Sequence, residues 1–236
     1  MGRRRGVLLL ALAVATGAPS AASAATAAGA YARGASRCAA IGGVPASADA
    51  LVDVRAPSVR STRAAVFLDR RRGTCWVAVA GPFGAWVGAN GLSAHHVEGD
   101  LTTPLGVFGF EPVIYGIDPN PGLTGPYHRL VCGDWWDEAP VSPQYNQFVH
   151  VACGTVPRFA NGSEALWREA PAYDAFAVVA YNTAPRLAGR GSGIFVHEST
   201  GNPTAGCVSL EWGNLLTVLR FITSGPRAAI SIRVTG

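Results

Sequence analysis

Residues 194–223 read IFVHESTGNPTAGCVSLEWGNLLTVLRFIT, and this stretch decides the fold of the chain. It begins with a short apolar run ending at His197, which is typical of a buried strand. A polar loop of Gly, Asn, Pro and Thr follows and leads to Cys207. Apolar residues then recur at helical spacing over 210–223, and Ser209 is a candidate N-cap. We therefore expect a strand, a cysteine-bearing loop and a helix in direct succession.

This order of residue types favours nucleophilic chemistry. A helix N-terminus stabilises negative charge, so a thiol placed there, such as that of Cys207, ionises more readily. The imidazole of His197, at the end of the preceding strand, is a candidate base for that thiol. A structural interpretation stays open, because a single cysteine is often a buried apolar residue or half of a disulfide.

The first residues predict export. Arg3, Arg4 and Arg5 precede an apolar stretch over 6–18, and Ala22-Ser23-Ala24 fits a signal-peptidase site. We expect residues 1–24 to be a signal peptide cleaved after Ala24, with delivery to the cell wall or the exterior. An uncleaved anchor is the alternative.

Composition excludes several classes of function. Without residues 1–24 the chain holds 16 basic and 15 acidic residues, and it contains no lysine. No basic stripe suited to nucleic acid remains. No later stretch is long enough to cross a bilayer. Residues 25–60, rich in Ala, Gly and Ser, are predicted to be a flexible lead-in, and residues 61–236 one domain.

An odd number of cysteines in an exported protein indicates one free thiol. Cys132 and Cys153 flank a loop rich in Trp, Asp and Pro, so a bridge between them is favoured. Cys38 and Cys75 would then form the second bridge, leaving Cys207 free. The sequence does not fix this connectivity, because four cysteines allow three pairings.

Most of the remaining sequence is predicted to form strands. The runs at 64–69 and 74–80 indicate a hairpin, and 176–181, 194–197 and 229–234 are further strands. A second, shorter helix is expected over 163–169. The longest loop, about 117–146, carries several aromatic residues, which favours a functional role. The fold class is therefore mainly β with one clear helix.

A second motif lies upstream, where residues 100–110 read DLTTPLGVFGF. On its own, Thr-Pro-x-Gly-x-Phe is a turn entering a strand, because proline fixes the turn and glycine relaxes the backbone.

The two motifs together resemble the L,D-transpeptidase (YkuD-type) catalytic domain. The resemblance covers about Val66–Val234 and rests on Thr-Pro-x-Gly-x-Phe followed by His…Thr-x-Gly-Cys. It implies a β-sandwich or barrel that acts outside the cell on peptidoglycan. It also implies that Cys207 is the nucleophile and His197 the base, with Thr204 and Gly206 completing the motif.

The sequence departs from the family pattern at three places. The second histidine of the motif is Ala205 here, and the polar residue after the cysteine is Ser209 rather than Asn or Arg. The loop between His197 and Cys207 is short. The chain therefore looks like a divergent branch that carries its own disulfide-closed insert at Cys132–Cys153.

The resemblance also implies a mechanism without metal or other cofactor. Cys207 would attack a carbonyl of a peptidoglycan stem peptide, forming a thioester and releasing a terminal D-amino acid. His197, oriented by the carbonyl of Glu198, would move the proton, and backbone N–H groups near Gly206 and Cys207 would stabilise the oxyanion. Carbapenem-type inhibitors are expected partners.

Three residues of the long loop, Tyr127, Trp136 and Asp137, are candidates to line the cleft. Asp137 would meet the side-chain amine of a diamino acid. An aromatic plug over the core is the alternative interpretation of this group.

Other functions stay open. If water resolves the thioester, the activity is L,D-carboxypeptidase; if catalysis has decayed, the chain is a cell-wall-binding module. The order His before Cys disfavours the common cysteine peptidases of the wall. His95, His96 and Glu98 suggest a metal, but this spacing is not a common ligand pattern, so no metal site is predicted.

Overall fold

The computed structural model describes residues 38–225 and 227–235. The predicted signal peptide, 1–24, and the first part of the predicted lead-in lie outside the described residues. The described part is mainly β, with one α-helix, which confirms the expected class. Within it, no helix has the length and apolar character needed to cross a bilayer.

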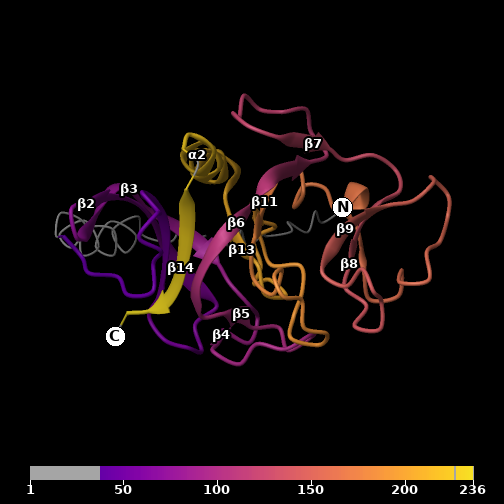
Figure 1. The fold of residues 1–236 in the computed structure, drawn as a ribbon, viewed down its shortest axis with the longest axis horizontal. Coiled ribbons are helices and arrows are strands. Elements are labelled where there is room, and N and C mark those ends of the chain that lie inside the picture. Colours follow the sequence, from indigo (N-terminus) through magenta and orange to yellow (C-terminus); the bar gives the residue numbers. More distant parts are fainter. Residues whose placement is uncertain (1–37, 226, 236) are drawn as a thin grey trace, which may run out of the picture.

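A closed barrel forms the body of the molecule (Figure 1). It closes because β11 pairs with β12 on one side and with β6 on the other. In order around the wall, the strands are β11 (Phe176–Val179), β12 (Phe195–Glu198), β13 (Val208–Leu210), β3 (Cys75–Trp86), β2 (Arg63–Arg72), β1 (Ala50–Ala56), β14 (Ala228–Val234) and β6 (Gly106–Gly116). A short strand, β7 (Tyr127–Arg129), extends β6 in parallel.

The barrel interior follows from strand alternation. In β1 and β2, Val52 pairs with Leu68 and Val54 with Val66, and all four side chains are buried in the main core. Successive side chains of a strand point to opposite faces, so the residues between them face outward. The helix α2 (Trp212–Thr223) packs an apolar face against the same core and lies beside β13 and β14 (Figure 1).

Two predictions about where strands lie in the sequence are wrong. The strand β1 lies inside residues 25–60, predicted as a flexible lead-in, yet it is buried and paired on both sides, with β2 and β14. The strand predicted over 74–80 does not end at residue 80, because β3 continues through Gly81-Pro82 to Trp86 with an irregular register beside β2. Pairing with strands that are distant in the sequence stabilises these segments as strands, and local composition does not reveal this pairing.

The helix begins later than predicted. Ser209 is the middle residue of β13, buried, and therefore not an N-cap. The cap position is Glu211, whose side chain makes no capping hydrogen bond. The expected second helix over 163–169 is instead a two-residue strand, β10 (Glu164–Ala165), followed by a single 3₁₀ turn, η1 (Leu166–Arg168).

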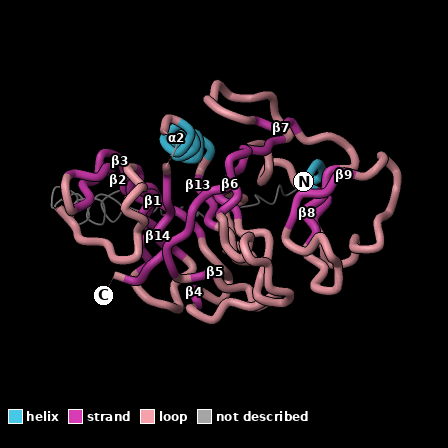
Figure 2. The backbone as a smooth tube through the Cα atoms, viewed as in Figure 1, coloured by secondary structure: helices cyan, strands magenta, loops and turns pink. Residues whose placement is uncertain are grey.

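An insert covers the outer face of β11, β12 and β13. Its small sheet contains β10, β8 (Asp134–Asp137) and β9 (Gln147–His150), on the opposite side of the molecule from β2 and β3 (Figure 2). A second core lies between insert and barrel and includes Trp136, Phe176, Phe195 and Cys207. Cys207 is therefore at the junction of these two parts.

The disulfides are those expected from the sequence. Cys132 bridges to Cys153 across the insert, and Cys38 bridges to Cys75 at the start of β3. Cys207 is the free cysteine. Because disulfides persist mainly in oxidising compartments, two of them indicate a non-cytoplasmic location.

A long loop brings the Thr-Pro motif to the barrel. It runs between the two-residue strands β4 (Leu92–Ser93) and β5 (Thr103–Pro104), which pair in parallel. The hydroxyl of Thr103, fully buried, lies 3.4 Å from the carbonyl oxygen of Cys207. This contact places the loop over 94–102 next to the cysteine.

Candidate active site

Cys207 directly precedes β13 and is held in place by its backbone. The hydroxyl of Thr204 donates to the Cys207 carbonyl at 2.7 Å and accepts the Gly206 N–H at 3.2 Å. A β-carbon on Gly206 would lie only 3.0 Å from the carbonyl oxygen of Thr102. Glycine at this position therefore allows the close approach of the Thr-Pro loop to the cysteine loop.

The thiol of Cys207 is buried, with 8 % of the residue exposed. Its sulfur accepts the Phe195 N–H at 3.3 Å and donates to the Gly193 carbonyl at 3.2 Å. Burial raises the pKa of the thiol, the nearby Glu164 raises it further, and the Phe195 N–H only partly offsets this. The resting thiol is therefore protonated, so attack on a carbonyl requires a base to remove the proton.

This protonation state corrects one sequence argument. The helix α2 begins at Trp212, after the whole of β13, so its N-terminus is not at Cys207. The stabilisation of negative charge by a helix falls off within its first turn. The helix therefore does not lower the pKa of this thiol.

His197 lies on β12 with its ring oriented as expected. Its Nδ1 donates to the Glu198 carbonyl at 2.7 Å, which leaves Nε2 as the acceptor. The ring contacts the ring of Tyr173 edge to face, at 5.6 Å between centroids. Burial lowers the pKa of His197 to about 4, with the Glu198 hydrogen bond opposing, so the imidazole is neutral at pH 7 and able to accept a proton.

His197 and Cys207 face the same side of the sheet. In the parallel pair β12–β13, His197 is opposite Ser209, and the Phe195 N–H bonds the Cys207 sulfur. The two functional residues are therefore diagonal neighbours on the outer face of the barrel. Strand spacing and rise put such β-carbons about 8 Å apart. In the resting geometry the hydrogen bonds of the sulfur go to backbone groups and not to the imidazole.

A cavity of about 490 Å³ opens at Cys207. Among the described residues, its ionisable lining consists of Cys207, His96 and three carboxylates, Glu98, Glu138 and Glu164, without an arginine. Burial raises the pKa of Glu164 to about 7 although Tyr173 donates a hydrogen bond to it, and burial beside Glu164 raises the pKa of Glu138 as well. The cavity beside the thiol is therefore lined by carboxyl groups, and part of these groups is protonated near neutral pH.

The three predicted cleft residues lie outside this cavity. Asp137 is fully buried and binds the Ala139 N–H and the Ser142 hydroxyl, so it stabilises its own turn. Trp136 packs in the second core against Phe195, and its indole N–H donates to Asn146. Tyr127 donates from its hydroxyl to the Asp118 carbonyl on the β7 side.

Sequence reasoning considered His96 and Glu98 only as metal ligands, which it rejected, and it missed Glu138 and Glu164. The carboxylates come from three separate segments, the loop after β4, the end of β8 and β10. No local pattern reveals that such segments converge. The available signal was Thr102 of the Thr-Pro motif, because the loop that it closes carries both His96 and Glu98.

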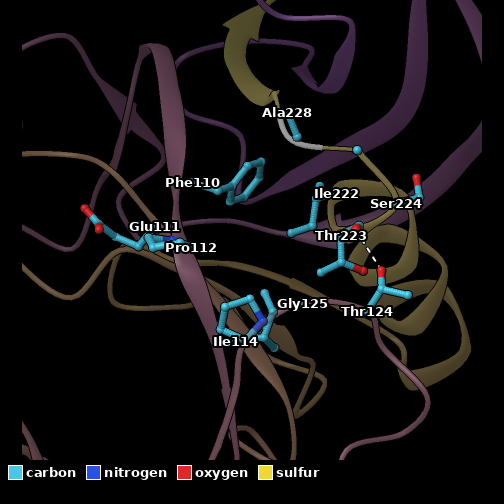
Figure 3. A pocket seen from close by; sticks show the side chains of 12 residues that line it. Phe110, Glu111, Pro112, Ile114, Thr124, Gly125, Ile222, Thr223, Ser224 and Ala228 are labelled. Atoms are coloured by element: carbon cyan, nitrogen blue, oxygen red, sulfur yellow. Dashed lines mark hydrogen bonds between the residues drawn. The ribbon is translucent and has the colours of Figure 1, made fainter.

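A second large cavity, of about 530 Å³, lies between β6 and the C-terminal end of α2 (Figure 3). Neither Cys207 nor His197 lines it. Glu111, the ionisable residue that lines it among the described residues, extends away from the other lining side chains in Figure 3. The hydroxyl of Thr124 is already bound to the Thr223 carbonyl at 2.7 Å. Within the part of the chain that the structure describes, no cysteine or histidine lines this cavity.

Barrel and site together define a disulfide-bonded, mainly β protein with one buried free thiol facing a cavity. No protein-family model, curated protein or solved structure matches the chain.

Proposed function

We propose that the protein is an exported cysteine acyltransferase of the L,D-transpeptidase type, acting on peptidoglycan stem peptides. The observation that carries the proposal is the relation of Cys207 to His197. A free thiol and an imidazole with a fixed tautomer occupy the same face of adjacent strands. The Thr-Pro motif, which belongs to the resemblance, packs against the cysteine loop.

In this function, Cys207 attacks the carbonyl carbon of the donor peptide while its proton passes to Nε2 of His197. The bond to the terminal D-amino acid breaks, and this residue leaves as a free amine after taking up a proton. An amine of a second stem then attacks the thioester and regenerates the thiol. General-base assistance of this kind contributes about 10²–10⁴-fold to the rate.

The oxyanion needs backbone donors. The geometry favours the N–H of Cys207, because the cavity reaches its loop, whereas the Gly206 N–H already donates to the Thr204 hydroxyl. Removing one such donor typically costs about 10²–10³-fold in rate. Export through the signal peptide 1–24 brings the protein to this substrate and belongs to the same proposal.

The test is incubation of residues 25–236 with defined muropeptides, followed by separation and mass analysis of the products. We expect loss of a terminal D-amino acid and a new amide cross-link, both absent with Cys207→Ala. Loss of the D-amino acid without a cross-link would identify a carboxypeptidase. Unchanged muropeptides with the wild-type protein, or equal products with Cys207→Ala, would contradict the proposal.

A further inference from the structure

A second imidazole lies at the cavity of Cys207. His96, on the loop between β4 and β5, lines the cavity, and only 6 % of the residue is exposed. A β-carbon on Gly206 would lie 3.7 Å from its Cε1. A β-carbon on Gly191 would collide with its Nε2 and Cδ2, so the absence of a side chain at Gly191 makes room for the ring.

The ring is held by a carboxylate. Nδ1 of His96 lies 2.8 Å from Oδ1 of Asp100 and 3.1 Å from the hydroxyl of Thr102. Asp100 also accepts the N–H groups of Val97 and Thr102, at 3.0 and 2.8 Å. Burial acts to raise the pKa of Asp100, but the backbone hydrogen bonds outweigh it and the pKa is below its ordinary value. Asp100 is therefore ionised and fixes the Nδ1 proton of His96, leaving Nε2 for proton transfer.

We propose that His96, oriented by Asp100, is the proton donor to the leaving amine at Cys207. The inference rests on the proposed function and deepens it. It divides proton transfer between two imidazoles, His197 serving the thiol and His96 the substrate nitrogen.

The steps balance. In the first, the S–C bond forms, the thiol proton moves to His197, the C–N bond breaks, and the departing nitrogen takes a proton from Nε2 of protonated His96. In the second, an acceptor amine attacks the thioester and gives its proton to His96. The C–S bond breaks, and the sulfur recovers its proton from His197, so both imidazoles return to their starting states.

Burial explains why one imidazole is not sufficient. His197 is enclosed by Tyr173 and its own strand and does not line the cavity, whereas His96 does. Nδ1 of His96 lies against the carboxylate of Asp100, whereas the hydrogen bond of His197 goes to a backbone carbonyl.

Several charged or titratable groups lie around the His96 ring. Tyr181 packs edge to face on the ring, at 5.3 Å between centroids, and its hydroxyl binds the carbonyls of His96 and Arg190. The remaining groups are Asp100 and Glu98 on its own loop, Arg190 on the facing loop, and Cys207, Glu138 and Glu164 across the cavity.

The experiment compares two donors that differ in their leaving group. A stem-peptide amide needs a proton on its departing nitrogen, whereas a p-nitrophenyl ester does not. We expect His96→Gln to slow release of the D-amino acid at least 10²-fold and to change acylation by the ester less than threefold. His197→Gln should slow both reactions. His95→Gln, at the exposed neighbouring position, is the matched control and should change neither.

Each outcome decides the inference. Suppose that wild-type protein is acylated at Cys207. If His96→Gln then slows the reactions with both donors equally, or slows neither reaction, the inference is wrong, while the proposed acyltransferase function stands. If wild-type protein is acylated by neither donor, both proposals fail. Should His96→Gln not fold, Asp100→Asn replaces it, with the amide rate falling selectively and acylation by the ester changing less than threefold. An equal change of both rates in Asp100→Asn would overturn the inference.

Discussion

Ser209 lies directly opposite His197 on the parallel strands β13 and β12, and its buried hydroxyl has no hydrogen-bond partner among the described residues. A buried hydroxyl without a partner costs about 1–3 kcal/mol of stability. In the proposed acyl transfer, the Ser209 hydroxyl neither donates nor accepts a transferred proton.

We therefore expect Ser209→Ala to raise the free energy of unfolding by about 1 kcal/mol, since it removes an unsatisfied group. Urea denaturation of the two proteins measures the difference. Thr204→Val is the opposing control, because it removes two hydrogen bonds of the cysteine loop and should destabilise by about 1–2 kcal/mol. A clear loss of stability in Ser209→Ala would show that the hydroxyl is bound after all.

Asp69 should make stability depend on pH. Only 1 % of it is exposed, both carboxylate oxygens lack a hydrogen bond within the described part of the chain, and Arg55 is 3.6 Å away. Burial and the neighbouring Asp53 raise its pKa from 3.8 to about 6. Since folding favours the protonated form, this contribution is complete below pH 4 and is lost as the pH rises through 6.

The Asp69 effect between pH 4 and pH 7 is about 2 kcal/mol, from the difference between a pKa of 3.8 in the unfolded chain and about 6 in the folded protein. We expect Asp69→Asn to flatten the pH dependence relative to wild type in that range, measured by denaturation at several pH values. Other buried carboxylates titrate too, so the difference between the two proteins is the quantity to compare. Parallel curves would contradict this account of Asp69.

The Cys132–Cys153 bridge should stabilise the insert. It closes a segment with a sequence separation of 21 residues that contains β8 and β9. For a loop of this length, chain entropy gives about 3 kcal/mol. We expect Cys132→Ala with Cys153→Ala to lower the free energy of unfolding by about this amount. No change in the urea midpoint would mean that the bridge does not constrain the unfolded chain.

The protein should contain one thiol that reacts slowly. Because burial raises the pKa of Cys207, iodoacetamide at pH 7.5 should label the folded protein far more slowly than a small-molecule thiol. In guanidinium without reductant, we expect one thiol per chain. Two or more reactive thiols in the unfolded protein would contradict the disulfide pairing, and rapid labelling of the folded protein would contradict the burial.

The sequence shows local features of this fold but not its long-range contacts. The hairpin of β2 and β3 and the strand before His197 are visible in runs of apolar residues. The strand β1 is hidden next to Ala-rich sequence because its order comes from pairing with β14 at the far end of the chain. Likewise β6 carries Pro112 among its residues, which reads as a strand breaker until its partners are known.

The site divides in the same way. His197 and Cys207 are close in sequence, so their common face follows from a strand–loop–strand unit. The closure of the barrel and the packing of the insert bring His96 and the carboxylates to the cavity, and no local sequence pattern encodes this arrangement. The predicted start of the helix is wrong for a similar reason. Pairing with β3 holds Ser209 and Leu210 in a strand, so the helix begins after them.

The most direct test of the central claim is mass spectrometry of the intact protein after incubation with a carbapenem, followed by peptide mapping. The account predicts one covalent adduct, located on Cys207, that forms with wild-type protein, slows strongly in His197→Gln and is absent in Cys207→Ala. An adduct on another residue, or folded wild-type protein that remains unmodified, would contradict it.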